Sequence, residues 1–285
     1  MIYNWAYNKT VSSKKEGMPS KNPVTNHMLK RLETLVQQQQ PDVVIATYSL
    51  CAHLMSLLKL KTGWQVPLVT CITDVTTHTV WINRQTDLYL VAAPCTKESL
   101  LELGVPEQRI LISGIPVRSS FQQPVLRQET VDKPKELLLM GGGLGLLPAD
   151  KEFYVQLDKT PNVHTTVITG KNEKLYRKLA GKFERIQVLG FTDQVAHYMR
   201  QADLIITKPG GITMFEAIHS ELPMLVFQPF LEQEVKNGEY LQANGLGIVL
   251  DKKPEEAISE IRGILRDTGR LEMMKANMRQ VKRCV

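Results

Sequence analysis

Cysteine is scarce in this sequence, and the cysteines that are present form no cluster. The 285 residues contain four of them, without a CxxC spacing and without histidines at ligand spacing: Cys51, Cys71, Cys95 and Cys284. Zinc sites and disulfide frameworks both need clustered cysteines. The pattern therefore argues against both kinds of site and favours a reducing compartment.

Long apolar runs and a secretory leader are also lacking. No apolar stretch approaches the roughly 18 residues that a membrane-spanning helix requires. In residues 1–15 the lysines follow the apolar patch, which is the reverse of a secretory signal peptide. The apolar content of 43% and the charged content of 22% are typical of a folded soluble protein. We therefore expect a cytoplasmic protein with one large core or two medium ones.

Positive charge is concentrated at the two ends of the chain. The net charge is +6, and residues 1–40 and 266–285 each hold six Lys or Arg against two acids. Such ends suit an anionic membrane surface or a polyanion, although two solvated helical ends would give the same pattern. Basic and aromatic residues are not interleaved, which argues against a nucleic-acid partner. The sequence does not indicate an oligomeric state.

Short apolar runs alternate with helical patterns along the chain. In the first half, the pattern predicts strands at 43–48, 67–73, 88–93 and 110–115. In the second half, it predicts strands at 136–142, 165–170, 186–191, 204–207, 224–228 and 247–250. Continuous apolar runs between helices are typical of parallel sheets covered on both faces. The prediction is an α/β fold with two Rossmann-like domains, which bind ligands at the carboxyl ends of strands.

A polar, proline-containing stretch without periodicity separates the two halves. Such a stretch is typical of a linker between domains. The predicted organisation is a first domain, a linker, a ligand-binding second domain and a basic C-terminal helix, at residues 1–117, 118–135, 136–266 and 267–285.

A glycine-rich loop follows the first predicted strand of the second domain. Residues 141–145 contain four glycines, which would let backbone N–H groups approach a phosphate closely. A dinucleotide fingerprint needs a glycine at the sixth position, where Leu146 stands, and the Walker pattern is not met either. The alternative interpretation is a tight turn into a helix.

A second loop, KPGG at 208–211, runs directly into a helical pattern. Thr213 and Glu216 fit an S/T-x-x-E capping box at the start of that helix. The same residues fit a site in which the glycines contact a diphosphate and Glu216 binds a ribose diol. A capping carboxylate and a ribose-binding carboxylate occupy nearly the same place, so this motif leaves both interpretations open.

A third loop, PFLEQEVKNGEY at 229–240, places amide and carboxylate side chains at a helix start. Gln233, Glu234 and Asn237 provide the paired donors and acceptors that sugar hydroxyls require. The alternative is a polar first turn. Three such loops in one domain make a nucleotide-sugar site the better interpretation of the set.

The motifs of the two halves resemble one family. KPGG-T--EA and P---QE--N are similar to the donor half of the family 28 glycosyltransferases. CITDVTTHTVW at 71–81 and ILISGIPVR at 110–118 resemble the diacylglycerol glucosyltransferase and monogalactosyldiacylglycerol synthase branch. The resemblance covers about residues 41–266. It implies the GT-B fold with an incomplete first domain, and a peripheral enzyme at the inner face of the cell membrane.

The same resemblance implies a reaction and a set of donor-binding residues. A hexose would pass from UDP-glucose or UDP-galactose to diacylglycerol or a glycolipid, with inversion and with no metal or other cofactor. Gly142 and Gly143 would face the diphosphate, Gly170 the nucleotide, the backbone at Phe191 the uracil, and Glu216 the ribose. The whole expected set is Gly142, Gly143, Gly170, Phe191, Lys208, Gly210, Gly211, Thr213, Glu216, Gln233, Glu234 and Asn237.

One family feature is missing from the sequence. Members begin with a strand and a glycine-rich loop ending in a histidine thought to activate the acceptor, whereas the first predicted strand here is 43–48. On the order of 70–100 residues, about two βα units, are expected to be absent. Inverting transfer needs a general base. The base therefore lies elsewhere, or the chain is a half-enzyme that needs a partner, or it binds nucleotide sugars without catalysis.

Asp74 and His78 are the candidates to replace the missing base. They follow the predicted strand 67–73 at its carboxyl end, where ligands of such sheets bind. If the segment is helical, their spacing would bring the carboxylate against the imidazole and raise its basicity. Alternatively, Asp74 caps the next helix and His78 only binds the acceptor or packs on Trp81.

Overall fold

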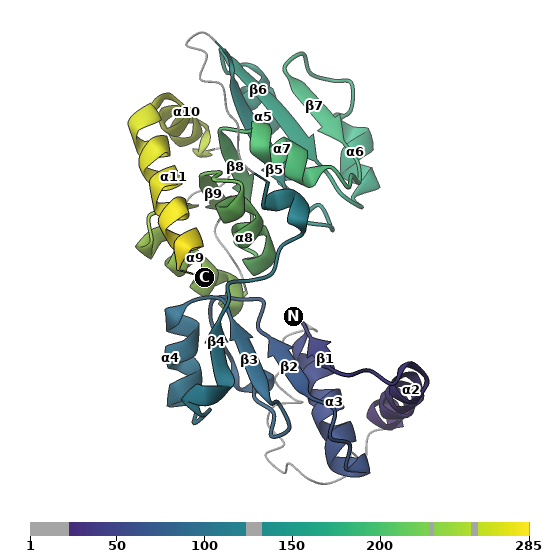
Figure 1. The fold of residues 1–285 in the computed structure, drawn as a ribbon. Coiled ribbons are helices and arrows are strands. Elements are labelled where there is room, and N and C mark those ends of the chain that lie inside the picture. Colours follow the sequence, from purple (N-terminus) through teal and green to yellow (C-terminus); the bar gives the residue numbers. More distant parts are fainter. Residues whose placement is uncertain (1–22, 124–132, 228–230, 252–255, 285) are drawn as a thin grey trace. The chain divides into compact units, whose positions relative to one another are not determined.

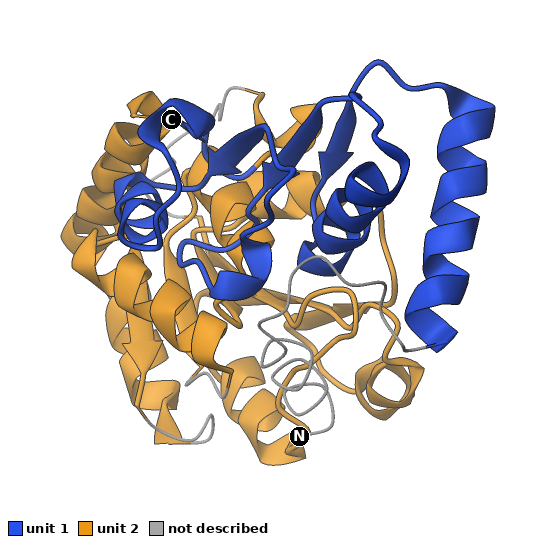
Figure 2. Cartoon of the chain, turned by 90° about the horizontal axis from the view of Figure 1, so that it is seen from below, with its two compact units in different colours: residues 1–115 blue, residues 116–285 orange. Residues whose placement is uncertain are grey.

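The computed structural model describes residues 23–123, 133–227, 231–251 and 256–284. The chain divides into two compact units, unit 1 at Met1–Ile115 and unit 2 at Pro116–Val285 (Figure 2). Each unit is built on a parallel sheet with helices packed against it (Figure 1). The α/β architecture predicted from the alternating pattern is therefore confirmed.

Unit 1 contains a four-stranded parallel sheet in the order β1-β2-β3-β4. Its strands are β1 (Val44–Ala46), β2 (Leu68–Cys71), β3 (Leu88–Val91) and β4 (Ile110–Ile112). Its helices are α2 (Pro23–Gln39), α3 (Ser49–Thr62) and α4 (Pro94–Glu102), with the 3-10 turns η1 (Thr79–Trp81) and η2 (Glu107–Arg109). Each of these strands lies within one of the apolar runs predicted for the first half.

One apolar cluster of unit 1 forms where α3 packs against the sheet. Met55 and Leu58 of α3 are almost fully buried and lie in one cluster with Leu68 of β2. Gly63 ends α3, because its φ of 73° is a left-handed conformation that glycine adopts without strain.

Unit 2 contains a six-stranded parallel sheet in the order β10-β9-β8-β5-β6-β7. Its strands are β5 (Lys135–Met140), β6 (Val163–Ile168), β7 (Ile186–Leu189), β8 (Leu204–Thr207), β9 (Met224–Phe227) and β10 (Gly247–Leu250). Its helices are α5 (Lys151–Asp158), α6 (Glu173–Leu179), α7 (Val195–Gln201), α8 (Gly211–His219), α9 (Glu232–Ala243), α10 (Ile258–Arg266) and α11 (Thr268–Arg283). The four residues of β8 are all buried, as expected for a central strand.

The strand order of unit 2 reverses between β5 and β8. From β5 the chain moves outward through β6 and β7, and it then returns to place β8, β9 and β10 on the other side. Because crossovers between parallel strands are right-handed, this reversal puts helices on both faces of the sheet. Doubly wound sheets bind ligands outside the carboxyl ends of the two strands at such a reversal.

The predicted linker at 118–135 is packed structure at its beginning. Ser119–Phe121 form the 3-10 turn η3, whose last residue is fully buried. Arg200 of α7 donates a hydrogen bond to the Ser120 carbonyl oxygen. These first residues therefore belong to unit 2, which a polar and aperiodic sequence gave no reason to expect. Residues 124–132 lie outside the described residues.

Candidate functional site

Two loops of unit 2 and the start of helix α9 meet at the carboxyl edge of its sheet. They follow β5, β8 and β9, and β8 lies between the other two strands. Lys208 links these segments, because its side chain lies beside Gly142 and Gly210. Its Cε would be 3.6 Å from a Cβ added to Gly142 and 4.0 Å from a Cβ added to Gly210. Its Nζ lies 2.7 Å from Glu234 Oε1. The structure thus brings together residues that the sequence separates by about a hundred positions.

The glycine loop after β5 is a folded turn. Gly145 N–H donates to the Gly142 carbonyl (2.9 Å), and Lys171 N–H donates to the Gly143 carbonyl (3.0 Å). A Cβ on Gly170 would lie 2.7 Å from Gly143 O, and the φ of Gly170 is +55°, so this position requires glycine. Among the described residues, nothing lies within 4 Å of a Cβ placed on Gly143. The loop therefore has an open side that a phosphate could approach.

Helix α8 begins before the predicted capping box. Gly210 is its N-cap residue and accepts the first helical hydrogen bond from Met214 N–H at 2.9 Å. Thr213 is therefore the third helical residue and Glu216 lies in the second turn, so the capping-box interpretation is wrong for both. No side chain of the described residues caps this end. The first N–H groups of α8 are thus available to an anion.

Glu216 is held in a partly dehydrated position. Burial raises the pKa of its carboxyl to about 7, and the charge of Arg118 opposes that rise. Arg118 itself lies over the Phe121 ring, with Cζ 5.4 Å from the centroid. A carboxyl with a burial-shifted pKa beside a specific cation is typical of a functional site. Sequence reasoning assigned no role to Arg118, although the residue ends the ILISGIPVR block.

Helix α9 supplies the third group of predicted ligand residues. Gln233 and the Lys208 partner Glu234 lie in its first turn and are half-buried. Asn237 is fully buried, and its Nδ2 donates to the Pro209 carbonyl at 2.9 Å. We predicted a sugar contact for Asn237, whereas this placement favours a supporting role that fixes the KPGG loop to α9. Residues 228–230 of the predicted loop lie outside the described residues.

The two remaining predicted residues lie at the same edge of the sheet. Gly170 and Phe191 come shortly after the ends of β6 and β7, and the Phe191 side chain is 71% exposed. Every residue predicted to bind the donor therefore lies in a segment that follows the carboxyl end of a unit 2 strand, either in the loop or in the first two turns of the next helix.

The predicted catalytic residues lie in unit 1, between β2 and η1. The segment from Asp74 to His78 is not helical, so the condition under which we predicted a contact between the two side chains is not met. His78 is instead the N-cap of η1, and its Nδ1 accepts a long hydrogen bond from Val80 N–H (3.4 Å). An acceptor role for Nδ1 places the proton of the neutral ring on Nε2.

A search of the described residues finds no group of three or more His, Cys, Asp or Glu side chains that could hold a metal ion. Within the same ranges, no helix is both long and apolar enough to cross a membrane.

The chain matches two family models, one for each unit. Residues 1–117 match the model of monogalactosyldiacylglycerol (MGDG) synthase, and residues 146–284 match the glycosyltransferase family 28 C-terminal domain. A "Processive diacylglycerol beta-glucosyltransferase" of Bacillus cereus (strain AH187) is 33% identical over 264 residues, covering 89% of this chain and 67% of that protein. The chain belongs to glycosyltransferase family 28. The family resemblance predicted from the sequence motifs is confirmed.

Further relatives of this family 28 member agree with that assignment. A protein of the same description from Bacillus thuringiensis (strain Al Hakam) is 32% identical over 264 residues, with 89% of this chain and 67% of that protein covered. MurG of Acinetobacter baumannii has a TM-score of 0.66 at 17% identity, over 92% of this chain and 77% of that one. MnaA of S. aureus in complex with UDP has a TM-score of 0.67 at 16% identity, over 91% and 76%. These structures confirm the GT-B fold.

Proposed function

We propose that this protein transfers a hexose from UDP-glucose or UDP-galactose to diacylglycerol or a glycolipid. Its relatives are described as diacylglycerol glucosyltransferases, and the fold neighbour MnaA was solved with UDP. The observation that carries the proposal is the partly buried carboxyl of Glu216 in the helix that follows β8, at the β5/β8 reversal. A nucleotide sugar carries the groups that this edge can bind: a diphosphate, a ribose diol and a hexose.

In the proposed complex, each loop binds one part of the donor. The open side of Gly143 and the uncapped start of α8 receive the diphosphate, whose charge Lys208 balances. Glu216 accepts hydrogen bonds from the ribose hydroxyls, and Gln233 and Glu234 bind the hexose. Arg118 lies near Glu216 and favours the ionised carboxylate that accepts those bonds.

We propose an inverting transfer without a metal or other cofactor. The acceptor hydroxyl oxygen attacks the anomeric carbon, the bond from that carbon to UDP breaks, and UDP leaves with the bonding electron pair. The hydroxyl proton passes to a base, and His78 is the candidate in this chain. A base needs an unprotonated ring nitrogen. In His78 that nitrogen is Nδ1, so the acceptor hydroxyl would have to replace Val80 N–H as its hydrogen-bond donor.

The reaction is proposed to take place at the inner face of the cell membrane, where the lipid acceptor is found. Basic side chains would hold the protein there through anionic lipids. In α11, Lys275 pairs with Glu272 and Lys282 pairs with Glu221, which reduces the charge that this helix offers to a surface. The basic residues before position 23 lie outside the described residues.

Donor binding through the ribose is tested with UDP and 2′-deoxy-UDP. The wild-type protein should prefer UDP by about tenfold, the effect of one hydrogen bond to a charged group. Glu216→Gln should show a smaller preference, because its neutral amide oxygen accepts a weaker hydrogen bond from the 2′-hydroxyl than the carboxylate does. Glu232→Gln, a matched change in an exposed side chain at the start of α9, should keep the preference. An unchanged preference in Glu216→Gln would contradict the assignment.

A further inference from the structure

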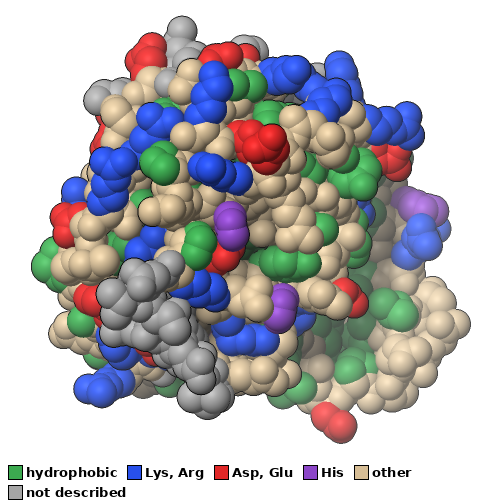
Figure 3. All heavy atoms as spheres, turned by 90° about the horizontal axis from the view of Figure 1, so that it is seen from above, with side chains coloured by type: hydrophobic (Ala, Val, Ile, Leu, Met, Phe, Trp, Pro, Cys, Tyr) green, Lys and Arg blue, Asp and Glu red, His purple; other side chains and the backbone are tan. Residues whose placement is uncertain are grey.

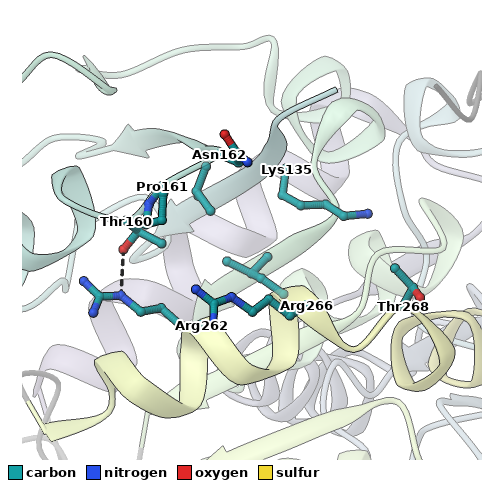
Figure 4. Close-up of a pocket in the computed structure, with 9 residues that line it drawn as sticks. Lys135, Thr160, Pro161, Asn162, Arg262, Arg266 and Thr268 are labelled. Atoms are coloured by element: carbon teal, nitrogen blue, oxygen red, sulfur yellow. Dashed lines mark hydrogen bonds between the residues drawn. The ribbon is translucent and has the colours of Figure 1, made fainter. Parts of the chain in front are cut away.

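A pocket of about 270 Å³ lies at the opposite edge of the unit 2 sheet from the glycine loop. Lys135 begins β5 and Asn162 precedes β6, so the pocket opens at the amino ends of these strands. Helix α10 contributes Arg262 and Arg266, and Thr268 begins α11. Figure 4 shows the two arginines on the helix below, with Lys135 and the segment of Thr160, Pro161 and Asn162 above them. Amino and carboxyl ends lie at opposite edges of a parallel sheet, so this pocket is separate from the proposed donor site.

The pocket is lined by positive charge. Lys135, Arg262 and Arg266 line it, and none of the described lining residues is Asp or Glu. The Asp203 carboxylate is 3.8 Å from Lys135 Nζ and also accepts the Glu136 N–H at 2.9 Å. Lys and Arg side chains also appear over much of the face that Figure 3 shows.

The guanidinium of Arg262 is fixed by neutral groups. Its Nε donates to Thr160 Oγ1 (3.1 Å), and its Nη2 donates to the Gln156 carbonyl (2.9 Å). Thr160 is 3% exposed and donates to the same carbonyl at 3.1 Å, so the anchor is rigid. Two of the five guanidinium N–H groups are used in this way, and no carboxylate of the described residues forms an ion pair with Arg262. An arginine anchored by neutral acceptors is oriented in advance for an anion.

We propose that this pocket binds a phosphate group, as a free phosphomonoester or as a phospholipid headgroup. Arg262 and Arg266, one helical turn apart, provide a pair of guanidinium groups that matches phosphate oxygens. The Lys135 ammonium adds a third charge, and the side chains of Asn162 and Thr268 provide neutral donors. A volume of about 270 Å³ suits a headgroup-sized ligand. The proposal is independent of the donor site.

The test titrates the full chain with inorganic phosphate, in saturating UDP and against chloride at equal ionic strength. The amide resonances of Asn162 and Thr268 should shift with phosphate alone. Arg266→Gln should weaken this binding about tenfold, the effect of one charge-assisted hydrogen bond. Lys135→Gln should weaken it as well. Arg270→Gln removes the same charge from an exposed position outside the pocket lining and should change affinity less than about twofold.

A second arm identifies the source of the phosphate. Wild type, Arg266→Gln and Arg270→Gln are sedimented with phosphatidylcholine vesicles, with and without phosphatidylglycerol. Binding that needs phosphatidylglycerol and is lost only in Arg266→Gln supports a lipid headgroup, whereas a response to inorganic phosphate alone supports a soluble phosphoester. The proposal is overturned if phosphate acts no more strongly than chloride and no vesicle binding depends on Arg266. Equal losses in the two arginine variants would also overturn it, because they would indicate unspecific charge attraction.

Discussion

At the scale of single residues, Lys208 and Glu216 are held in different ways at the carboxyl edge of unit 2. Lys208 pairs at 2.7 Å with Glu234, whose side chain is only 12% exposed. Such a pair contributes little net stability, because desolvation offsets the attraction. The ion pair with Glu234 holds Lys208 in position before a donor binds. In the proposed complex, the diphosphate would compete with Glu234 for this lysine. Glu216 differs from Lys208, because burial disfavours the ionised form of its carboxyl and so raises its pKa.

The buried carboxyl of Glu216 predicts a pH-dependent stability. Its pKa is about 7 in the folded protein and near the ordinary 4.5 in the unfolded chain, so the folded state keeps the proton up to a higher pH. The free energy of unfolding should therefore fall as the pH rises from 4.5 to 7 and stay lower above that. Glu216→Gln should lack this fall and exceed the wild type by about 1–3 kcal/mol near pH 8, with little difference near pH 4.

Urea unfolding at a series of pH values measures this difference. Glu184→Gln, which changes an exposed glutamate of unit 2, is the matched control and should follow the wild-type curve. A Glu216→Gln curve parallel to the wild type would show that the carboxyl is not held in a dehydrated position.

At the scale of elements, the glycine loop depends on close contact between the segments that follow β5 and β6. Gly170 has the left-handed φ of +55°, and an added Cβ would lie 2.7 Å from Gly143 O and 3.0 Å from Gly142 O. Gly181 has a similar φ of +69°, but among the described residues nothing lies within 4 Å of its Cβ position. A comparison of substitutions at the two glycines therefore distinguishes the cost of backbone strain from the cost of steric contact with the loop.

Gly170→Ala should therefore cost more than Gly181→Ala. Both variants lose about 1 kcal/mol from the left-handed φ, and Gly170→Ala should lose about 1–3 kcal/mol more because the loop must move. UDP affinity should fall only in Gly170→Ala. Thermal unfolding and UDP titration of the two variants measure the difference. Equal stability and equal affinity would mean that the two segments are not in contact as described.

The elements also show how far the sequence alone could lead. Strands were predictable because a central parallel strand such as β8 reads as one continuous apolar run. The position of the donor residues followed from the same rule, since carboxyl ends of parallel strands share one edge. The capping-box match at Thr213 and Glu216 was misleading, because Gly210 is the N-cap of α8 and the helix begins at Gly211.

Other parts of the site depend on contacts between segments distant in sequence. The burial of Asn237 under the Pro209 carbonyl joins residues 28 positions apart. The place of Arg118 near Glu216 joins a stretch without periodicity to a helix of unit 2. Neither relation has a local signal, since hydrophobic periodicity describes only the face that one element presents. The predicted pairing of Asp74 with His78 assumed a helix, whereas the chain is extended or bent between these residues.

At the scale of the whole molecule, the two units match two different family models. The unit 1 match is to monogalactosyldiacylglycerol synthase, and the unit 2 match is to the family 28 C-terminal domain. The chain spans 67% of the length of the Bacillus cereus relative. We therefore test the proposed donor binding and the proposed transfer by separate measurements.

The central claim is that this chain transfers hexose to a lipid. The direct measurement incubates the whole chain with labelled UDP-glucose or UDP-galactose and diacylglycerol vesicles, and follows label entering the lipid fraction. We predict labelled glycolipid, and a rate lowered about 10²–10⁴-fold in His78→Ala with unchanged UDP affinity. Robust transfer in His78→Ala would remove the base assignment alone. Tight UDP binding with no label in lipid would contradict the central claim, and would indicate a nucleotide-sugar-binding chain that needs a partner for the acceptor.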